Sequence, residues 1–251
     1  MKTAIIIGAT SGIGREVAIR LIGEGWKVGI AGRREDRLKE IQDQYGRESV
    51  SYAVIDVTSP DATQALDTLL AQTGAPDLFL HVSGVGRQNP KMDEEIEVKV
   101  MDTNCSGMVR MVSHFINYVK NNPAYNQNRK AHIAVVTSVA GTGGIGISAA
   151  YSASKKMQST YLSALSQLAR MEKLPVFFTD IRPGFVATDI LDKSKNYPLV
   201  MPVEKAADYI LRGLKRKRRI VIFDWRFRLL TALWRLIPRP VWERLTIIKT
   251  N

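Results

Sequence analysis

The sequence has little of what a secreted or membrane-spanning protein needs. Cys105 is the single cysteine among 251 residues, so the chain can form no internal disulfide and no cysteine cluster for zinc. This composition is typical of a reducing compartment, and we expect a cytoplasmic protein. The first apolar run, residues 4–7, is too short for a signal-peptide core, and charges interrupt the most hydrophobic C-terminal stretch, residues 220–237. The sequence therefore predicts neither a signal peptide nor a transmembrane helix.

Metal-ligand spacing and domain linkers are also lacking. The three histidines, His81, His114 and His132, are scattered without ligand spacing, so we expect structural roles for them and no metal site. No internal repeat and no Gly/Ser-rich linker divides the chain. We therefore predict one domain, residues 1–223, followed by a C-terminal extension, residues 224–251.

Positive charge is concentrated in the last forty residues. Residues 212–251 hold 12 of the 36 Lys and Arg but 2 of the 24 Asp and Glu. Arginines there alternate with large apolar side chains, namely Trp225, Phe227, Leu229, Leu230, Leu233, Trp234, Leu236, Ile237 and Trp242. This amphipathic pattern suits a helix on an anionic membrane surface, which would make the protein a peripheral membrane protein. A cover over a substrate pocket or a subunit interface is the alternative, and nucleic acid is the least favoured partner.

Short β-branched runs alternate with longer helical patterns along the chain. The predicted strands are residues 3–7, 27–31, 50–55, 77–81, 131–136, 175–181 and 219–223. Strands that are almost wholly apolar are typical of a parallel sheet with helices on both faces. The pattern therefore predicts an α/β fold with a doubly wound, seven-stranded parallel sheet.

A glycine-rich turn follows the first predicted strand and precedes a helical pattern. Bare backbone amides at a helix N-terminus can bind a pyrophosphate, and the lack of side chains lets it approach closely. Glycines that serve only a tight turn are the alternative. We expect the dinucleotide contacts to come from Gly8, Thr10, Ser11, Gly12, Ile13 and Gly14.

The end of the second strand predicts which dinucleotide binds. Gly32 stands where an NAD enzyme carries an acid, and Arg33 and Arg34 follow it. Guanidinium groups can pair with a 2′-phosphate, so we expect NADP(H) to be preferred over NAD(H), although the arginines could simply face water. At the end of the third strand, Asp56 could bind the adenine amino group with Val57 against the ring, or Asp56 could cap the next helix.

Tyr151 and Lys155 stand four residues apart in a helical pattern, which places them on one face. A nearby ammonium stabilises a phenolate, so we expect Lys155 to lower the pKa of Tyr151 and prepare it for proton exchange. Ser138 ends the fifth strand, where open α/β sheets bind their ligands. Its hydroxyl can polarise a carbonyl oxygen.

Together, the glycine turn, Ser138 and the Tyr151–Lys155 pair make residues 1–223 resemble the short-chain dehydrogenase/reductase family, which has a Rossmann fold. The resemblance implies that Tyr151 is the general acid in reduction and that Lys155 also holds the nicotinamide ribose. It implies that Ser138 orients the carbonyl and that Asn104 anchors a water chain to Lys155. It further implies a homodimer or homotetramer and cofactor contacts at Ser83, Gly84, Pro183, Gly184, Val186 and Thr188.

These patterns predict an NADP(H)-dependent oxidoreductase that interconverts a ketone and a secondary alcohol. The apolar tail beside the expected pocket favours a hydrophobic, lipid-like substrate. A cofactor-binding regulator and a membrane-surface adaptor with little turnover are the alternatives.

Overall fold

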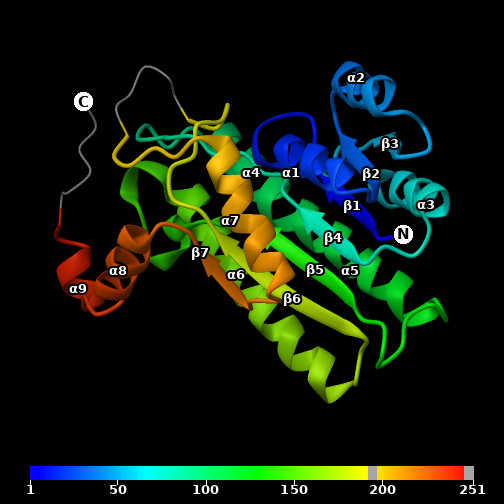
Figure 1. Cartoon of the computed structure of the whole chain (residues 1–251). Helices are drawn as coiled ribbons and strands as arrows, with labels where there is room; N and C mark the ends of the chain where they lie inside the picture. Colours follow the sequence, from blue (N-terminus) through cyan, green and yellow to red (C-terminus); the bar gives the residue numbers. More distant parts are fainter. Residues whose placement is uncertain (192–196, 246–251) are drawn as a thin grey trace.

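The computed structural model describes residues 1–191 and 197–245 (Figure 1). Residues 246–251 of the predicted extension lie outside the described residues. The strands are β1 (Thr3–Ile7), β2 (Lys27–Gly32), β3 (Val50–Val54), β4 (Leu78–His81), β5 (Ala131–Val136), β6 (Val176–Arg182) and β7 (Ile220–Ile222). The helices are α1 (Gly12–Gly23), α2 (Glu35–Tyr45), α3 (Ala62–Thr73), α4 (Glu94–Met101), α5 (Gly107–Asn121), α6 (Ala149–Met171), α7 (Val203–Lys215), α8 (Trp225–Trp234) and α9 (Arg239–Trp242). A π-helical turn, η1 (Asp102–Ser106), joins α4 to α5, and two 3₁₀ turns, η2 (Val139–Thr142) and η3 (Gly146–Ser148), follow β5.

The seven strands form one parallel sheet in the order β3-β2-β1-β4-β5-β6-β7. The predicted doubly wound sheet is confirmed, with strand ends within one residue of the expectation. The chain reverses its direction of winding between β1 and β4, which are neighbours. Ligands of such sheets bind beyond the carboxyl ends of the strands at this reversal, so we expect a ligand to bind after Ile7 and His81.

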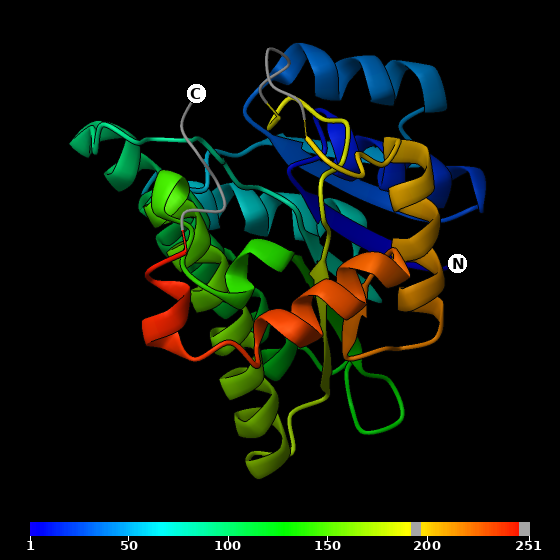
Figure 2. The same cartoon turned by 90° about the vertical axis from the view of Figure 1, so that its left-hand side faces the viewer.

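Helices cover both faces of the sheet (Figures 1 and 2). Ile6 of β1 belongs to a buried cluster with residues of α1, α2 and α7, whereas Ile5 and Ile7 belong to a second cluster with residues of α3, α5 and α6. In the second cluster the rings of Phe79 and Phe115 stack at 4.4 Å. Burial of each such side chain contributes about 1.5–3 kcal/mol to folding.

The extension folds back on the carboxyl-end side of the sheet. Asp224 turns the chain with a positive φ of 72°, and its carboxylate accepts the amide of Arg226 at 3.0 Å to begin α8. Phe227 and Thr231 are the buried residues of α8, which packs against η2. Within residues 1–191 and 197–245, no helix is both long enough and apolar enough to cross a bilayer.

Candidate active site

The loop after β1 is tight enough to require glycine. Gly8 has a φ of +96°, and a Cβ built on it would lie 2.6 Å from the amide nitrogen of Ser83. A Cβ on Gly14 would lie 2.0 Å from the carbonyl oxygen of Gly8, so the first turn of α1 packs directly on the end of β1. Gly12 also has a positive φ of 54°. Side chains are therefore excluded where a phosphate would need to approach the backbone.

The other residues of this loop have different environments. Ser11 is the N-cap residue of α1, and its hydroxyl makes no capping hydrogen bond. The side chain of Ile13 is buried in the core, so only its backbone can face a ligand. A Cβ on Gly12 would lie 3.0 Å from the methyl group of Thr188, which brings the segment after β6 to this loop.

A side chain at the end of β2 would press on Thr10. A Cβ on Gly32 would lie 2.6 Å from the Cγ2 atom of Thr10. Arg33 and Arg34 are both exposed, and the Nε and Nη2 atoms of Arg34 donate to Thr10 Oγ1 at 3.2 and 2.9 Å. Arg34 is therefore fixed to the glycine-rich loop.

Asp56 lies after β3 in a local turn. Its Oδ1 accepts hydrogen bonds from the amide and the hydroxyl of Thr58 at 3.0 and 2.7 Å. Burial raises the pKa of Asp56, but these bonds and the charge of Arg33 outweigh burial and leave the pKa below its usual value. Val57 is buried against Gly107 of α5. The Asp56 carboxylate thus supports the loop, and Val57 packs in the core.

Ser138, Tyr151 and Lys155 come from two neighbouring elements. Ser138 follows β5, and its Oγ accepts the amide of Ala140 at 3.1 Å at the start of η2. Tyr151 and Lys155 lie one turn apart near the start of α6, and the Lys155 Nζ is 5.7 Å from the centroid of the tyrosine ring. The ammonium is thus close enough to stabilise a negative charge on the phenol.

The expected direction of the Tyr151 pKa shift is wrong. Burial raises the pKa of Tyr151 above its usual value, and the opposing effect of the Ser138 hydroxyl is smaller. Burial also lowers the pKa of Lys155 to about 8. The sequence could not indicate this because both shifts depend on how deeply the side chains lie in the fold.

Asn104 lies in the π-helical turn η1 and is fully buried. Its side chain accepts the amide of Val85 at 2.8 Å and donates to the carbonyl of Val85 at 2.8 Å and to Ser154 Oγ at 3.0 Å. A Cβ on Gly84 would lie 3.1 Å from Asn104 Oδ1 and 3.4 Å from Lys155 Nζ. Asn104 therefore joins the segment after β4 to α6, directly beside the lysine.

The segment after β6 packs against the Ser138 loop on one side and against α8 on the other. The carbonyl of Pro183 accepts the amide of Val139 at 3.0 Å, which ties this segment to the Ser138 loop. Phe227 of α8 lies over Gly184, where a Cβ would come within 2.3 Å of its ring. Val186 is buried in the core. Of the four residues expected here, Thr188 is the one whose side chain reaches the glycine-rich loop.

Sequence reasoning missed three residues near the Tyr151–Lys155 pair. A Cβ on Gly86 would lie 3.0 Å from the edge of the Tyr151 ring and 3.1 Å from Ile190, so Gly86 lies between the ring and Ile190. Gln158 contacts Lys155 from the next turn of α6. Its spacing of three residues from Lys155 was a usable signal, whereas nothing in the sequence places Gly86 and Ile190 together.

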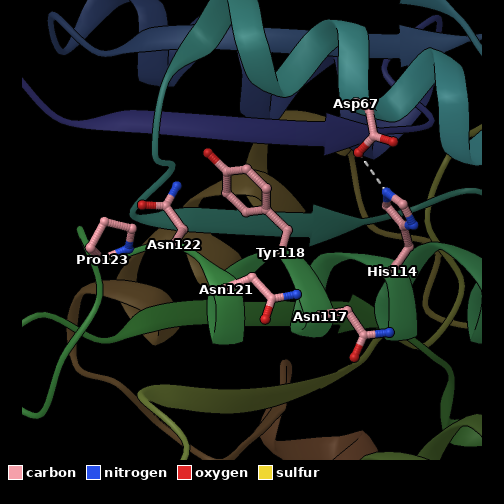
Figure 3. Close-up of a pocket in the computed structure, with 7 residues that line it drawn as sticks. All are labelled: Asp67, His114, Asn117, Tyr118, Asn121, Asn122 and Pro123. Atoms are coloured by element: carbon pink, nitrogen blue, oxygen red, sulfur yellow. Dashed lines mark hydrogen bonds and ion pairs between the residues drawn. The ribbon is translucent and has the colours of Figure 1, made fainter.

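A separate hollow lies between α3 and α5 and contains none of the predicted site residues (Figure 3). His114 Nε2 and Asp67 Oδ1 meet at its rim, 2.6 Å apart. The hollow is lined by Asp67, His114, Asn117, Tyr118, Asn121, Asn122 and Pro123. Because the glycine-rich loop and the tyrosine lie elsewhere, we place the candidate active site at the carboxyl ends of the strands.

Known proteins share both the sequence pattern and the fold. The pattern of the family described as short chain dehydrogenase matches residues 2–198. An uncharacterized oxidoreductase of Myxococcus xanthus is 32% identical over 96% of this chain and 95% of its own.

Two solved structures share the fold. A short chain dehydrogenase/reductase from Burkholderia phymatum in complex with NAD superposes with a TM-score of 0.80, at 22% identity over 92% of each chain. An actinorhodin polyketide ketoreductase with NADPH superposes with a TM-score of 0.74, at 20% identity over 88% of this chain and 95% of its own.

Proposed function

Since the chain belongs to the short chain dehydrogenase family, we propose that it is an NADP(H)-dependent oxidoreductase that interconverts a ketone and a secondary alcohol. The observation that carries the proposal is the meeting of Ser138, Tyr151 and Lys155, where the Ser138 hydroxyl bonds the phenol and the Lys155 ammonium lies by its ring. A phenol that can exchange a proton, next to a hydroxyl and an ammonium, suits the oxygen of a carbonyl or an alcohol.

The residues present fit a nicotinamide dinucleotide. In the loop from Gly8 to Gly14, the amides of Gly8 and Ala9 donate to the carbonyl of Ala31, so the amides that can serve a pyrophosphate are those nearer the start of α1, at the positive end of its dipole. Among the described residues, the Lys155 ammonium donates two hydrogen bonds, to Val136 and Gln158, so its third hydrogen can serve a ribose hydroxyl. The further contacts with this cofactor are those that the family resemblance implies, at Ser83, Gly84, Pro183, Gly184, Val186 and Thr188. When bound, the cofactor supplies or accepts the hydride.

In the reducing direction, Tyr151 donates its phenolic proton to the substrate oxygen while the Ser138 hydroxyl orients that oxygen. Because burial raises the pKa of Tyr151, the phenol stays protonated and available for this transfer. The nearby Lys155 ammonium stabilises the phenolate that remains. Asn104 holds the backbone beside Lys155 in place.

The preference for NADP(H) rests on the end of β2. Two exposed guanidinium groups, Arg33 and Arg34, are available to a 2′-phosphate, and Arg34 is already held by Thr10. At position 32 the contact with Thr10 disfavours the carboxylate that would bind a free 2′-hydroxyl.

Fluorescence titration with NADPH and NADH tests this preference. The double variant Arg33→Ala, Arg34→Ala should lose NADPH affinity by roughly 10–100-fold and keep its NADH affinity, since each charge-assisted bond contributes about 1.5–3 kcal/mol. Arg37→Ala is the matched control, an exposed arginine in the first turn of α2, just after Arg33 and Arg34, that pairs with Glu40. Equal affinities of the wild type for the two cofactors would rule the preference out.

We propose a hydrophobic, lipid-like substrate because aromatic side chains of the tail pack beside the Ser138 loop. A Cβ on Gly143 would lie 2.9 Å from Trp234, and Trp242 binds the carbonyl of Gly144. NADPH oxidation with ketones graded from small and polar to long-chain tests the idea. Turnover should rise with chain length, and a preference for small polar ketones would contradict it.

A second candidate function, attachment to an anionic membrane surface, is favoured by the outer face of α8. Leu229, Leu230 and Leu233 are each more than half exposed there, and Arg226 and Arg228 are their neighbours. The basic run at residues 215–219 adds positive charge. An apolar face flanked by arginines suits the interface of an anionic bilayer.

Flotation with lipid vesicles tests this attachment. The protein should float with vesicles that contain phosphatidylserine and much less with phosphatidylcholine alone. The variant Leu229→Gln, Leu233→Gln should stay in the soluble fraction, whereas Leu168→Gln, an exposed leucine of α6, should behave as the wild type. Equal flotation of all three proteins would contradict the proposal.

The rival hypothesis of a cofactor-binding regulator predicts tight NADPH binding without turnover of any ketone.

The homodimer or homotetramer implied by the family resemblance is a separate proposal. Analytical ultracentrifugation of the full chain decides it, because a monomer at all concentrations would contradict it.

A further inference from the structure

Gln158 links two parts of the candidate active site through its side-chain amide. It lies on α6, three residues after Lys155, and is fully buried. Its Oε1 accepts a hydrogen bond from Lys155 Nζ at 3.0 Å, and its Nε2 donates to the backbone carbonyl of Asn104 at 2.7 Å. An ammonium can only donate and a carbonyl can only accept, so the two partners determine which way the amide faces.

The Asn104 end of this link is rigid. The π-helical turn η1 interrupts the regular helix here, and the Asn104 carbonyl receives a side chain 54 residues further along the chain. The Asn104 side chain is itself held by three hydrogen bonds, to both backbone groups of Val85 and to Ser154. Gln158 is therefore anchored to a fixed point of the fold.

The Lys155 end of the link carries a charge that burial disfavours. Lys155 is 4% exposed, and no carboxylate of the described residues forms an ion pair with it. Its ammonium donates to the Val136 carbonyl at 3.1 Å and to Gln158. Asp180 of β6 and Cys105 of η1 favour the charged form through their charge, and His81 of β4 also lies within electrostatic reach of Lys155. Within the described part of the chain, Gln158 provides the one side-chain hydrogen-bond acceptor for this ammonium.

We propose that Gln158 is a positioning residue that bridges Asn104 to Lys155, holds the ammonium beneath Tyr151 and keeps it charged. The role rests on the proposed oxidoreductase function. The family resemblance implied a water chain from Asn104 to Lys155, and here a side chain of the protein itself makes that connection. Because a carboxamide nitrogen keeps its protons at neutral pH, the bridge positions Lys155 and does not pass a proton along.

Titration of Lys155 in the full-length protein tests the bridge without any turnover. Carbon-13 NMR of labelled lysine, assigned with Lys155→Met, follows its pKa. Gln158→Met keeps the length of the side chain but removes the acceptor, so the pKa of Lys155 should fall by about one unit. Gln158→Glu places an anion at the acceptor position, so the pKa should rise. Gln167→Met, the same change at an exposed position of α6, should leave it unchanged.

Kinetics give the second readout. At neutral pH, Gln158→Met should reduce kcat for ketone reduction about tenfold, and kcat should recover partly at lower pH, where Lys155 regains its proton. A purely structural role would lower activity equally at every pH.

Equal Lys155 pKa values in wild type, Gln158→Met and Gln158→Glu would overturn the proposal. If Gln158→Met does not fold, the pKa of Lys155 in Gln158→Glu tests the proposal alone. A Lys155 pKa equal to that of the wild type in Gln158→Glu would also overturn the proposal. Failure of every ketone as a substrate would refute the proposed function and leave the NMR result standing.

Discussion

The indole nitrogen of Trp242 donates a hydrogen bond to the carbonyl oxygen of Gly144 at 2.6 Å, across 98 residues of sequence. Trp234 lies beside it, with ring centroids 4.6 Å apart, and contacts Gly143. The two rings therefore attach the end of the described chain to the loop that follows Ser138. The sequence left a membrane surface and a pocket cover as alternatives for this tail, and the inner face of α8 and α9 supports the second.

Replacement of Trp242 by Phe should loosen this loop. The variant loses the hydrogen bond but keeps an aromatic ring, so we expect the KM for an apolar ketone to rise by roughly 3–10-fold with little change in the KM for NADPH, as one neutral hydrogen bond contributes about 0.5–1.5 kcal/mol. Trp225→Phe, at a 71% exposed position of the same tail, is the control. Equal KM values for the ketone in both variants would contradict the pocket-cover role.

A single substitution at Gly32 should not change the cofactor preference to NADH. Gly32→Asp brings its Cβ against the Thr10 methyl group, so we expect a less stable protein with weak binding of both cofactors. Adding Thr10→Ser removes that methyl group, and the double variant should recover stability and bind NADH more tightly than NADPH. Thermal unfolding and fluorescence titration measure both effects. Full stability of Gly32→Asp alone would show that the contact with Thr10 is unimportant.

A side chain at Gly86 should displace Tyr151, because its Cβ would press on the edge of the tyrosine ring. Gly86→Ala places a methyl group 3.0 Å from that ring, so the ring or the loop must shift. A displacement of Tyr151, the proposed proton donor, should lower kcat/KM at least about tenfold while NADPH still binds. Gly146→Ala provides the control, since a Cβ there meets nothing within 4 Å. Similar kinetics of the two variants would mean that the Gly86 contact does not matter.

Two histidines, the buried His81 and the half-buried His132, should make the protein less stable in acid. Burial lowers the pKa of His81 to about 3 and that of His132 to about 4, from an ordinary 6.5. The unfolded chain binds protons on both rings below about pH 6.5, and the folded chain does so only near pH 4 and below. The free energy of unfolding is therefore fully present above pH 6.5 and decreases as the pH falls from 6.5 towards 4.

Urea unfolding between pH 7 and pH 4.5 measures this slope. His81 is the better position for a variant, because neither ring nitrogen has a hydrogen-bond partner among the described residues, although the backbone of Ser83 favours the charged ring slightly. His81→Leu should flatten the pH dependence at little cost in stability at pH 7. The same slope in wild type and variant would assign the acid sensitivity to other groups.

The sheet could be predicted because the residues that define each strand are consecutive in the sequence. Each strand is a short run of apolar, mostly β-branched residues between helical patterns, and β5 was predicted with its observed bounds, Ala131–Val136. The spacing of Tyr151 and Lys155 likewise defines one helix face. Local spacing cannot reveal partners that only the fold brings together. Gln158 contacts the Asn104 carbonyl from 54 residues away, and Gly86 meets Tyr151 from a different loop.

The predicted direction of the Tyr151 pKa shift was wrong for a related reason. A charge four residues away can be read from a helical pattern, but the depth of burial cannot, and burial is the larger effect here.

The most direct test of the account is ketone reduction by Tyr151→Phe in a single turnover from a saturated NADPH complex. The variant removes one hydroxyl and leaves the ring between Gly86 and Lys155 in place. We expect NADPH affinity within about threefold of the wild type and a rate of hydride transfer lower by at least about 100-fold, since a positioned general acid contributes about 10²–10⁴-fold. A rate equal to that of the wild type, with NADPH bound, would show that Tyr151 is not the proton donor and would contradict the proposed mechanism.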